Sequence, residues 1–67
     1  MLLLYKIEVQ LEDKLIHLII AADSDEKAFA SVESHVARHF IRMPEIRSAA
    51  IVEKKRIEPG NGFVIEG

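Results

Sequence analysis

Two histidines four residues apart are the side chains in this sequence best suited to chemistry. On a helix, His35 and His39 would lie one turn apart and could offer two imidazole nitrogens to zinc or another divalent ion. A metal site needs a third protein ligand, and the sequence does not bring His17, Glu33 or Asp25 to the same point. Imidazoles near a helix C-terminus also pack well and are favoured there when protonated. We therefore expect no metal site and no cofactor, although the sequence alone leaves open whether the pair binds metal.

Nucleophilic catalysis has little support in the residues present. The chain has no cysteine, and its serines lie outside any nucleophile and base motif. His17 is expected opposite Glu8 on a neighbouring strand, which is a common cross-strand pair. The Gly60-Asn61-Gly62 stretch precedes a predicted strand instead of a helix, so it indicates a turn and not a phosphate-binding loop. We expect that the protein is not an enzyme.

A cluster of basic residues near the C-terminus suggests an alternative function. Lys54, Lys55 and Arg56, together with Arg47, could form a basic patch that contacts phosphates. The overall charge of −2 and the acidic neighbours Glu53 and Glu58 argue against this. Weak nucleic-acid binding is kept as the alternative to a protein-interaction function, and a solvated edge strand is the simpler interpretation of the cluster.

The composition limits the architecture to one small domain. With 67 residues, a single domain spanning 1–67 is close to the size at which one hydrophobic core barely suffices for folding. The initial Met1-Leu2-Leu3-Leu4 run is interrupted by Tyr5-Lys6-Ile7-Glu8 before it reaches the length of a signal peptide or a membrane span. Because the chain also has no cysteine, we expect a cytoplasmic protein that is not embedded in a membrane.

The N-terminal third predicts a β-hairpin with a defined register. Residues 5–11 alternate strictly between apolar and polar, and a reversal at Glu12-Asp13 leads into a second strand at 15–22. The register that keeps apolar residues on one face makes three inner pairs: Tyr5 with Ile20, Ile7 with Leu18, and Val9 with Ile16.

A helix is predicted from Ser24 to about Arg42. Asp23 can cap its first turn, with Glu26 completing a capping box, and Pro44 ends the helical run. One apolar arc of the helix should face the sheet, and its members are Ala28, Phe29, Val32, Val36 and Phe40.

Two further strands are predicted after the helix. Residues 46–57 form the third, with a charged second half that suits a sheet edge, and Pro59-Gly60 makes a turn into a fourth at Phe63-Val64-Ile65. The fold class is then α+β, with two layers, the order β-β-α-β-β and one helix on a four-stranded sheet. Because the last strand is apolar on both faces, the grasp-like strand order 2-1-4-3 is favoured over the all-antiparallel order 2-1-3-4.

The second strand is apolar on both faces, although only one helix is available to cover the sheet. On the face away from the helix the register leaves a stripe formed by Leu2, Leu4, Leu15 and Ile19. A strand that is apolar on both faces expects a layer on each side. We therefore predict a homodimer or a complex with another protein, in which this stripe is the interface.

Several segments together resemble a family of small uncharacterised proteins, defined by a domain of unknown function, from spore-forming Gram-positive bacteria. They are Ala22 to Phe29, Arg38-His39-Phe40, Pro44-Glu45-Ile46, Glu53-Lys54-Lys55-Arg56 and Gly62-Phe63-Val64-Ile65. The resemblance spans almost the whole chain. It implies a bacterial cytosolic protein of unknown function, and it assigns no catalytic or binding residue.

Overall fold

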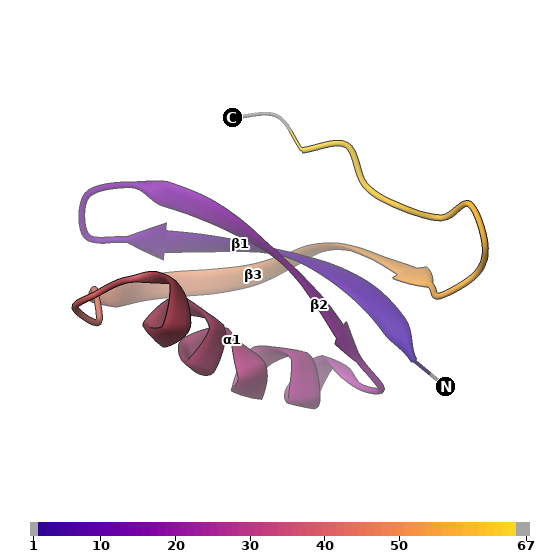
Figure 1. Cartoon of the computed structure of the whole chain (residues 1–67), viewed down its shortest axis with the longest axis horizontal. Coiled ribbons are helices and arrows are strands. Elements are labelled where there is room, and N and C mark those ends of the chain that lie inside the picture. The colour runs from indigo at the N-terminus through magenta and orange to yellow at the C-terminus, as the bar shows by residue number, and fades with distance from the viewer. Residues whose placement is uncertain (1, 66–67) are drawn as a thin grey trace.

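The computed structural model describes residues 2–65 and contains one helix and one antiparallel sheet. The elements follow the order β1 (Leu3–Leu11), β2 (Leu15–Ala22), α1 (Asp25–His39) and β3 (Ile46–Arg56). The sheet has the order β2-β1-β3, and α1 lies against one of its faces (Figure 1). Within the described residues no helix has the length and apolar character needed to span a membrane.

The hairpin of β1 and β2 has the predicted register. Tyr5 lies opposite Ile20, Ile7 opposite Leu18 and Val9 opposite Ile16. At the turn, the Leu11 backbone N–H donates to the Lys14 carbonyl at 2.8 Å, so only two residues connect the strands. The register is fixed because a slip by one residue would turn the apolar set toward solvent.

The predicted helix is confirmed, but its ends differ from the expectation. Ser24, and not Asp23, is the N-cap: its side chain accepts a hydrogen bond from the Lys27 backbone N–H at 3.2 Å. The Asp23 carboxylate instead pairs with the Lys27 ammonium group at 3.1 Å. The helix ends at His39 and not near Arg42, because Phe40 takes an extended conformation that directs the chain back toward the sheet.

The prediction of a fourth strand is wrong. β3 pairs with β1 along its whole length, so β1 is the central strand and has no free edge for another partner. Phe63-Val64-Ile65 is not a strand, and neither four-stranded order is correct. The turn before it does form: Gly60 has a φ of +88°, and the Asn61 N–H donates to the Glu58 carbonyl at 3.1 Å.

The core lies between α1 and the inner face of the sheet. Its buried residues are Tyr5, Ile7, Val9, Leu11, Ile20, Ala22, Ala28, Val32 and Val36. Two members of the predicted helical arc depart from the expectation. Phe29 is 42% exposed and Phe40 is only partly buried, because both lie at the margin of the arc that Ala28, Val32 and Val36 define.

Candidate functional site

The face of the sheet away from α1 carries the predicted apolar stripe. Its four residues are Leu2, Leu4, Leu15 and Ile19, which we call the outer stripe. Leu2 is 54% exposed, Leu15 46% and Ile19 39%, while Leu4 is partly buried. The ladder places Lys6 beside Ile19 and Gln10 beside Leu15, so polar side chains border the stripe. The ladder therefore brings Leu4, Leu15 and Ile19 to one face, and Leu2 directly precedes β1.

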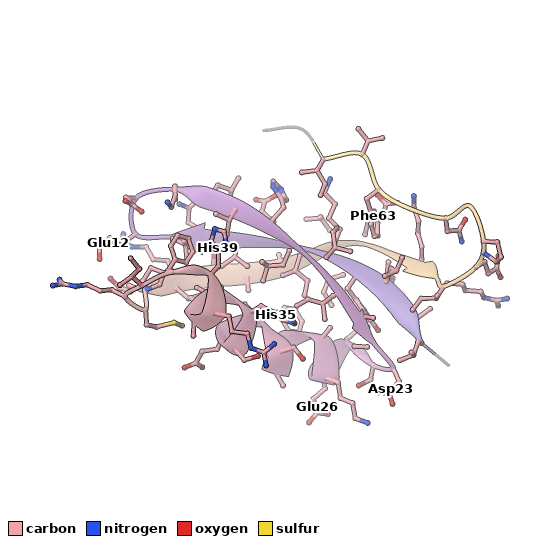
Figure 2. The ribbon with its side chains drawn as sticks, viewed as in Figure 1. Glu12, Asp23, Glu26, His35, His39 and Phe63 are labelled. Carbon is pink, nitrogen blue, oxygen red and sulfur yellow. The ribbon has the colours of Figure 1, made fainter. Side chains whose placement is uncertain are left out.

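The C-terminal segment lies on this outer face beside two members of the outer stripe, because its contacts are with Lys6, opposite Ile19, and with Lys55, opposite Leu4. After β3 the chain runs back along the side of the sheet opposite α1 (Figure 1). Lys6 Nζ donates to the Val64 carbonyl at 3.2 Å, and Lys55 Nζ donates to the Gly62 carbonyl at 2.6 Å. Lys55 Nζ also lies 4.8 Å from the centre of the Phe63 ring. Figure 2 shows Phe63 on the side of the sheet opposite α1. The chain thus provides some cover for its outer face itself, around Lys6 and Lys55.

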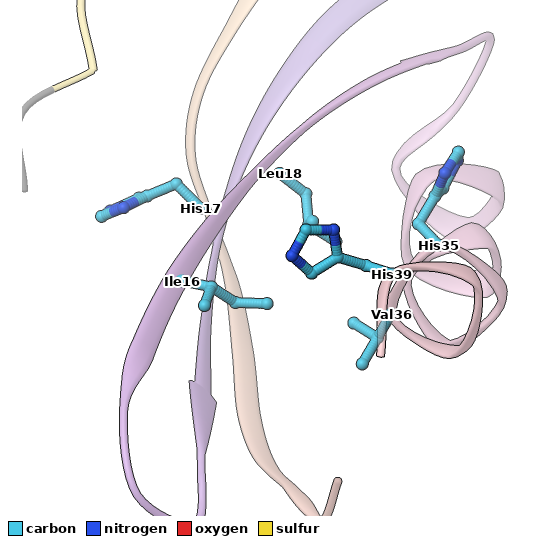
Figure 3. A pocket seen from close by; sticks show the side chains of 6 residues that line it. All are labelled: Ile16, His17, Leu18, His35, Val36 and His39. Carbon is cyan, nitrogen blue, oxygen red and sulfur yellow. The ribbon is translucent and has the colours of Figure 1, made fainter. Parts of the chain in front are cut away.

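The three histidines do not converge. An open groove of about 350 Å³ between β2 and the C-terminal half of α1 is lined by Ile16, His17, Leu18, His35, Val36 and His39. The His39 ring points across this groove toward Leu18, His35 points away from it, and His17 projects from the other face of β2 (Figure 3). His17 Nε2 lies 3.6 Å from Glu8 Oε2, which is the predicted cross-strand pair. Among residues 2–65 no group of three or more His, Cys, Asp or Glu side chains could hold a metal ion.

The basic residues of β3 do not form one patch. Arg47 and Arg56 lie nine residues apart along the strand, which corresponds to about 30 Å. Lys54 Nζ pairs with Asp25 Oδ1 at 3.2 Å on the helix side of the sheet. Lys55 is on the opposite face, where it pairs with Glu53 Oε2 at 3.1 Å. The two lysines therefore point to opposite sides, as adjacent residues of a strand must.

A polar cluster at the start of α1 was not predicted from the sequence. The Tyr5 hydroxyl donates to Asp25 Oδ1 at 3.0 Å, and Lys54 binds the same oxygen. Hydrogen bonds from Lys54 and Tyr5 lower the pKa of Asp25. Burial, together with the hydrogen bond to Asp25, raises the pKa of Tyr5. The signal that could have identified the cluster is Lys54, a charged residue at an inward position of β3 opposite Tyr5.

Comparison with known proteins gives a family without a known activity. The chain matches no curated protein and no solved structure. Residues 2–65 match the model of a family described as "Protein of unknown function (DUF3906)". Since this match spans nearly all of the sequence, the chain belongs to that family.

Proposed function

We propose that this protein is a small, non-enzymatic interaction module that self-associates through the outer stripe. The observation that carries the proposal is that Leu2, Leu15 and Ile19 stay exposed although the chain's own C-terminal segment lies on the same face. Isolated exposed apolar residues are ordinary, but several together on one sheet face are typical of an interaction surface. A second copy of the chain is the partner we propose.

The free energy available from this stripe is large for so small a domain. Burying about 400 Å² of extra apolar surface would contribute on the order of 10 kcal/mol before the costs of association are subtracted. Single domains are stable by only about 5–15 kcal/mol, so this contribution would be significant. A small domain with a limited core gains more from such burial than a large one does.

Geometry supports the non-enzymatic part of the proposal. A catalytic site needs a base aligned with a nucleophile and an orienting group. The side chains of His17, His35 and His39 point in three different directions. We also propose a cytoplasmic location, because the chain has no cysteine and so lacks the disulfides that are typical of proteins in oxidising compartments.

The nucleic-acid alternative has less support. Lys54 and Lys55 each pair with a carboxylate, and Arg47 and Arg56 are far apart on β3. Phosphate recognition gains affinity when several cations act together on one backbone. Salt-sensitive binding of labelled DNA or RNA at micromolar protein would restore this alternative.

The proposal is tested by a double substitution in the outer stripe. Leu4→Gln with Ile19→Gln should remove the self-association that the outer stripe provides and leave the chain folded, because both side chains lie on the face away from α1. The matched control is Ile41→Gln, which removes a fully exposed apolar side chain from the loop after α1 and should leave the dimer intact. Sedimentation velocity gives the mass, and circular dichroism gives the fold. A double variant that dimerises as the wild type does would remove the outer stripe as the interface.

A further inference from the structure

The second strand has an edge that nothing in the described structure pairs. β2 is at the end of the sheet, and β1 is its only hydrogen-bonded neighbour among residues 2–65. Strand edges of this kind present rows of free N–H and C=O groups and are natural templates for another strand.

The hairpin turn determines which residues of β2 face the open edge. Leu11 and Lys14 form a hydrogen-bonded pair, since the Leu11 N–H donates to the Lys14 carbonyl. In an antiparallel ladder hydrogen-bonded and non-hydrogen-bonded pairs alternate. Along the observed register, the even-numbered residues of β2 direct their backbone groups to β1. The residues whose backbone groups point to the open edge are Leu15, His17, Ile19 and Ala21.

The two edges of the sheet differ in how they are protected. β3 carries Glu53, Lys54, Lys55 and Arg56, and its ladder with β1 has two register shifts. Charges and bulges of this kind prevent an edge from pairing with other chains. β2 has neither: Leu15–Ala22 contains no proline and no Asp, Glu, Lys or Arg, and its pairing with β1 is regular.

We propose that β2 pairs edge to edge, in antiparallel orientation, with β2 of a second copy, around a twofold axis at Leu18. The two three-stranded sheets then form one continuous six-stranded sheet with both helices on the same face. A twofold contact of this type is the commonest form of homodimer.

The register follows from the outward-pointing residues. All four can pair only if Leu15 of one copy lies opposite Ala21 of the other and His17 lies opposite Ile19. On the helix side, this register places Leu18 opposite Leu18 and Ile16 opposite Ile20. Every inner pair is apolar, and on the outer face the large Leu15 meets the small Ala21. Because the strand is complementary to itself in this register, a second copy is the partner that it fits best.

The groove beside β2 supports the same partner. Ile16 and Leu18 face the helix side of the sheet, yet both are only partly buried, because the groove leaves them open toward the free edge. Val36 and His39 lie across the groove from them. A second copy at the edge would extend the inner face and cover these apolar side chains.

This inference goes beyond the proposed function, because the open edge and the outer stripe are different surfaces. Edge pairing leaves the outer stripe exposed, and burial of the outer stripe does not require edge pairing. Either contact can therefore fail while the other remains.

The test uses single cysteines in a chain that has none. In the proposed register Leu18 faces itself in a non-hydrogen-bonded pair with a Cα separation of about 4.5 Å, which is within the reach of a disulfide. Leu18→Cys should form a disulfide dimer with oxidised glutathione at least tenfold faster than Ile16→Cys. Ile16 is the matched control because it is on the same face but about 14 Å from its own copy. Equal rates, or no dimer from Leu18→Cys, would overturn the inference.

A second pair of variants covers the case in which Leu18→Cys does not fold. His17→Pro removes an outward N–H that β1 does not use, whereas His17→Ala removes the same side chain and keeps the N–H. We expect the dissociation constant of the dimer to be at least tenfold higher for His17→Pro than for His17→Ala. Circular dichroism should show that both variants are folded. Equal dimerisation would overturn edge pairing. A monomeric wild type would overturn both edge pairing and the proposed function. A dimer that is disrupted only by the outer-stripe variant would overturn edge pairing and support the proposed function.

Discussion

Asp25 connects the first turn of α1 to two strands of the sheet. Tyr5 from β1 and Lys54 from β3 both bind its Oδ1 atom. The carboxylate also lies at the helix N-terminus, where negative charge is favoured by the helix dipole. These contacts hold the helix in place over the sheet, so Asp25 should control part of the pH dependence of folding.

An aspartate with a lowered pKa stabilises the folded chain above its ordinary pKa of about 3.9. This contribution is lost as the pH falls through the lower, folded-state pKa, because the unfolded chain takes up its proton first. Asp25→Asn should therefore lower the free energy of unfolding at pH 7. This free energy should also fall less between pH 7 and acid pH in the variant than in the wild type. Urea unfolding between pH 7 and pH 2 measures this, with Asp13→Asn in the hairpin turn as the control. An unchanged acid profile in Asp25→Asn would show that other groups cause the decline.

The ionisation of Tyr5 is an independent probe of the same cluster. Its absorbance can be followed without interference, because Tyr5 is the only tyrosine and the chain has no tryptophan. Its pKa is raised above about 10, chiefly by burial and then by Asp25. The stability that depends on the neutral phenol is present below pH 10 and is lost as the pH rises through the raised folded-state pKa. A tyrosinate absorbance titration should give a midpoint above 10 that falls in Asp25→Asn but stays above that of the unfolded chain. Identical midpoints in wild type and variant would exclude the hydrogen bond as a cause.

At the scale of elements, the accuracy of the sequence predictions follows the length of the periodic pattern. β1, β2 and their register were predicted correctly because residues 5–11 alternate strictly and a slip by one residue would turn His17 of β2 toward the core. Phe63-Val64-Ile65 was assigned wrongly because three apolar residues carry no such pattern. Its placement depends on whether β1 has a free edge, and the sequence does not show that β3 fills it.

The helix cap can be tested with two serines. Ser24→Ala should destabilise the fold by about 1 kcal/mol, because the Lys27 N–H loses its acceptor. Ser34→Ala is the control, since Ser34 is exposed within the helix and its hydroxyl donates only to the Ser31 carbonyl. Its effect should be close to zero. Urea unfolding measures both, and equal losses would contradict the assignment of Ser24 as the N-cap.

The three-stranded sheet makes a different prediction from a four-stranded one. A chain that ends after Asn61 should keep its fold, because the hydrogen bonds between residues 62–65 and the sheet come from only two lysine side chains, Lys6 and Lys55. Far-ultraviolet circular dichroism and thermal unfolding test this. Loss of the cooperative transition would contradict the account, since it would mean that Phe63-Val64-Ile65 is a structural strand.

At the scale of the whole molecule, the outer stripe was predicted from sequence, and both predicted strand orders placed the second strand at an edge of the sheet, as it is in the structure. Exposure of Leu15 and Ile19 follows from the period of the strand once the register is known. The sequence did not predict that the sheet ends at β3, because strand order arises from contacts between segments distant in sequence. The family is confirmed by the match over residues 2–65, while its distribution among spore-forming Gram-positive bacteria stays a prediction.

The central claim is that this domain functions as an assembly of copies. Its most direct test is static light scattering of the wild-type chain over a range of concentrations, from low to high micromolar. We predict a mass that rises with concentration from the 7.6 kDa of one chain to at least twice that value. A mass that stays at 7.6 kDa across the whole range would contradict self-association, both through the outer stripe and through the edge of β2.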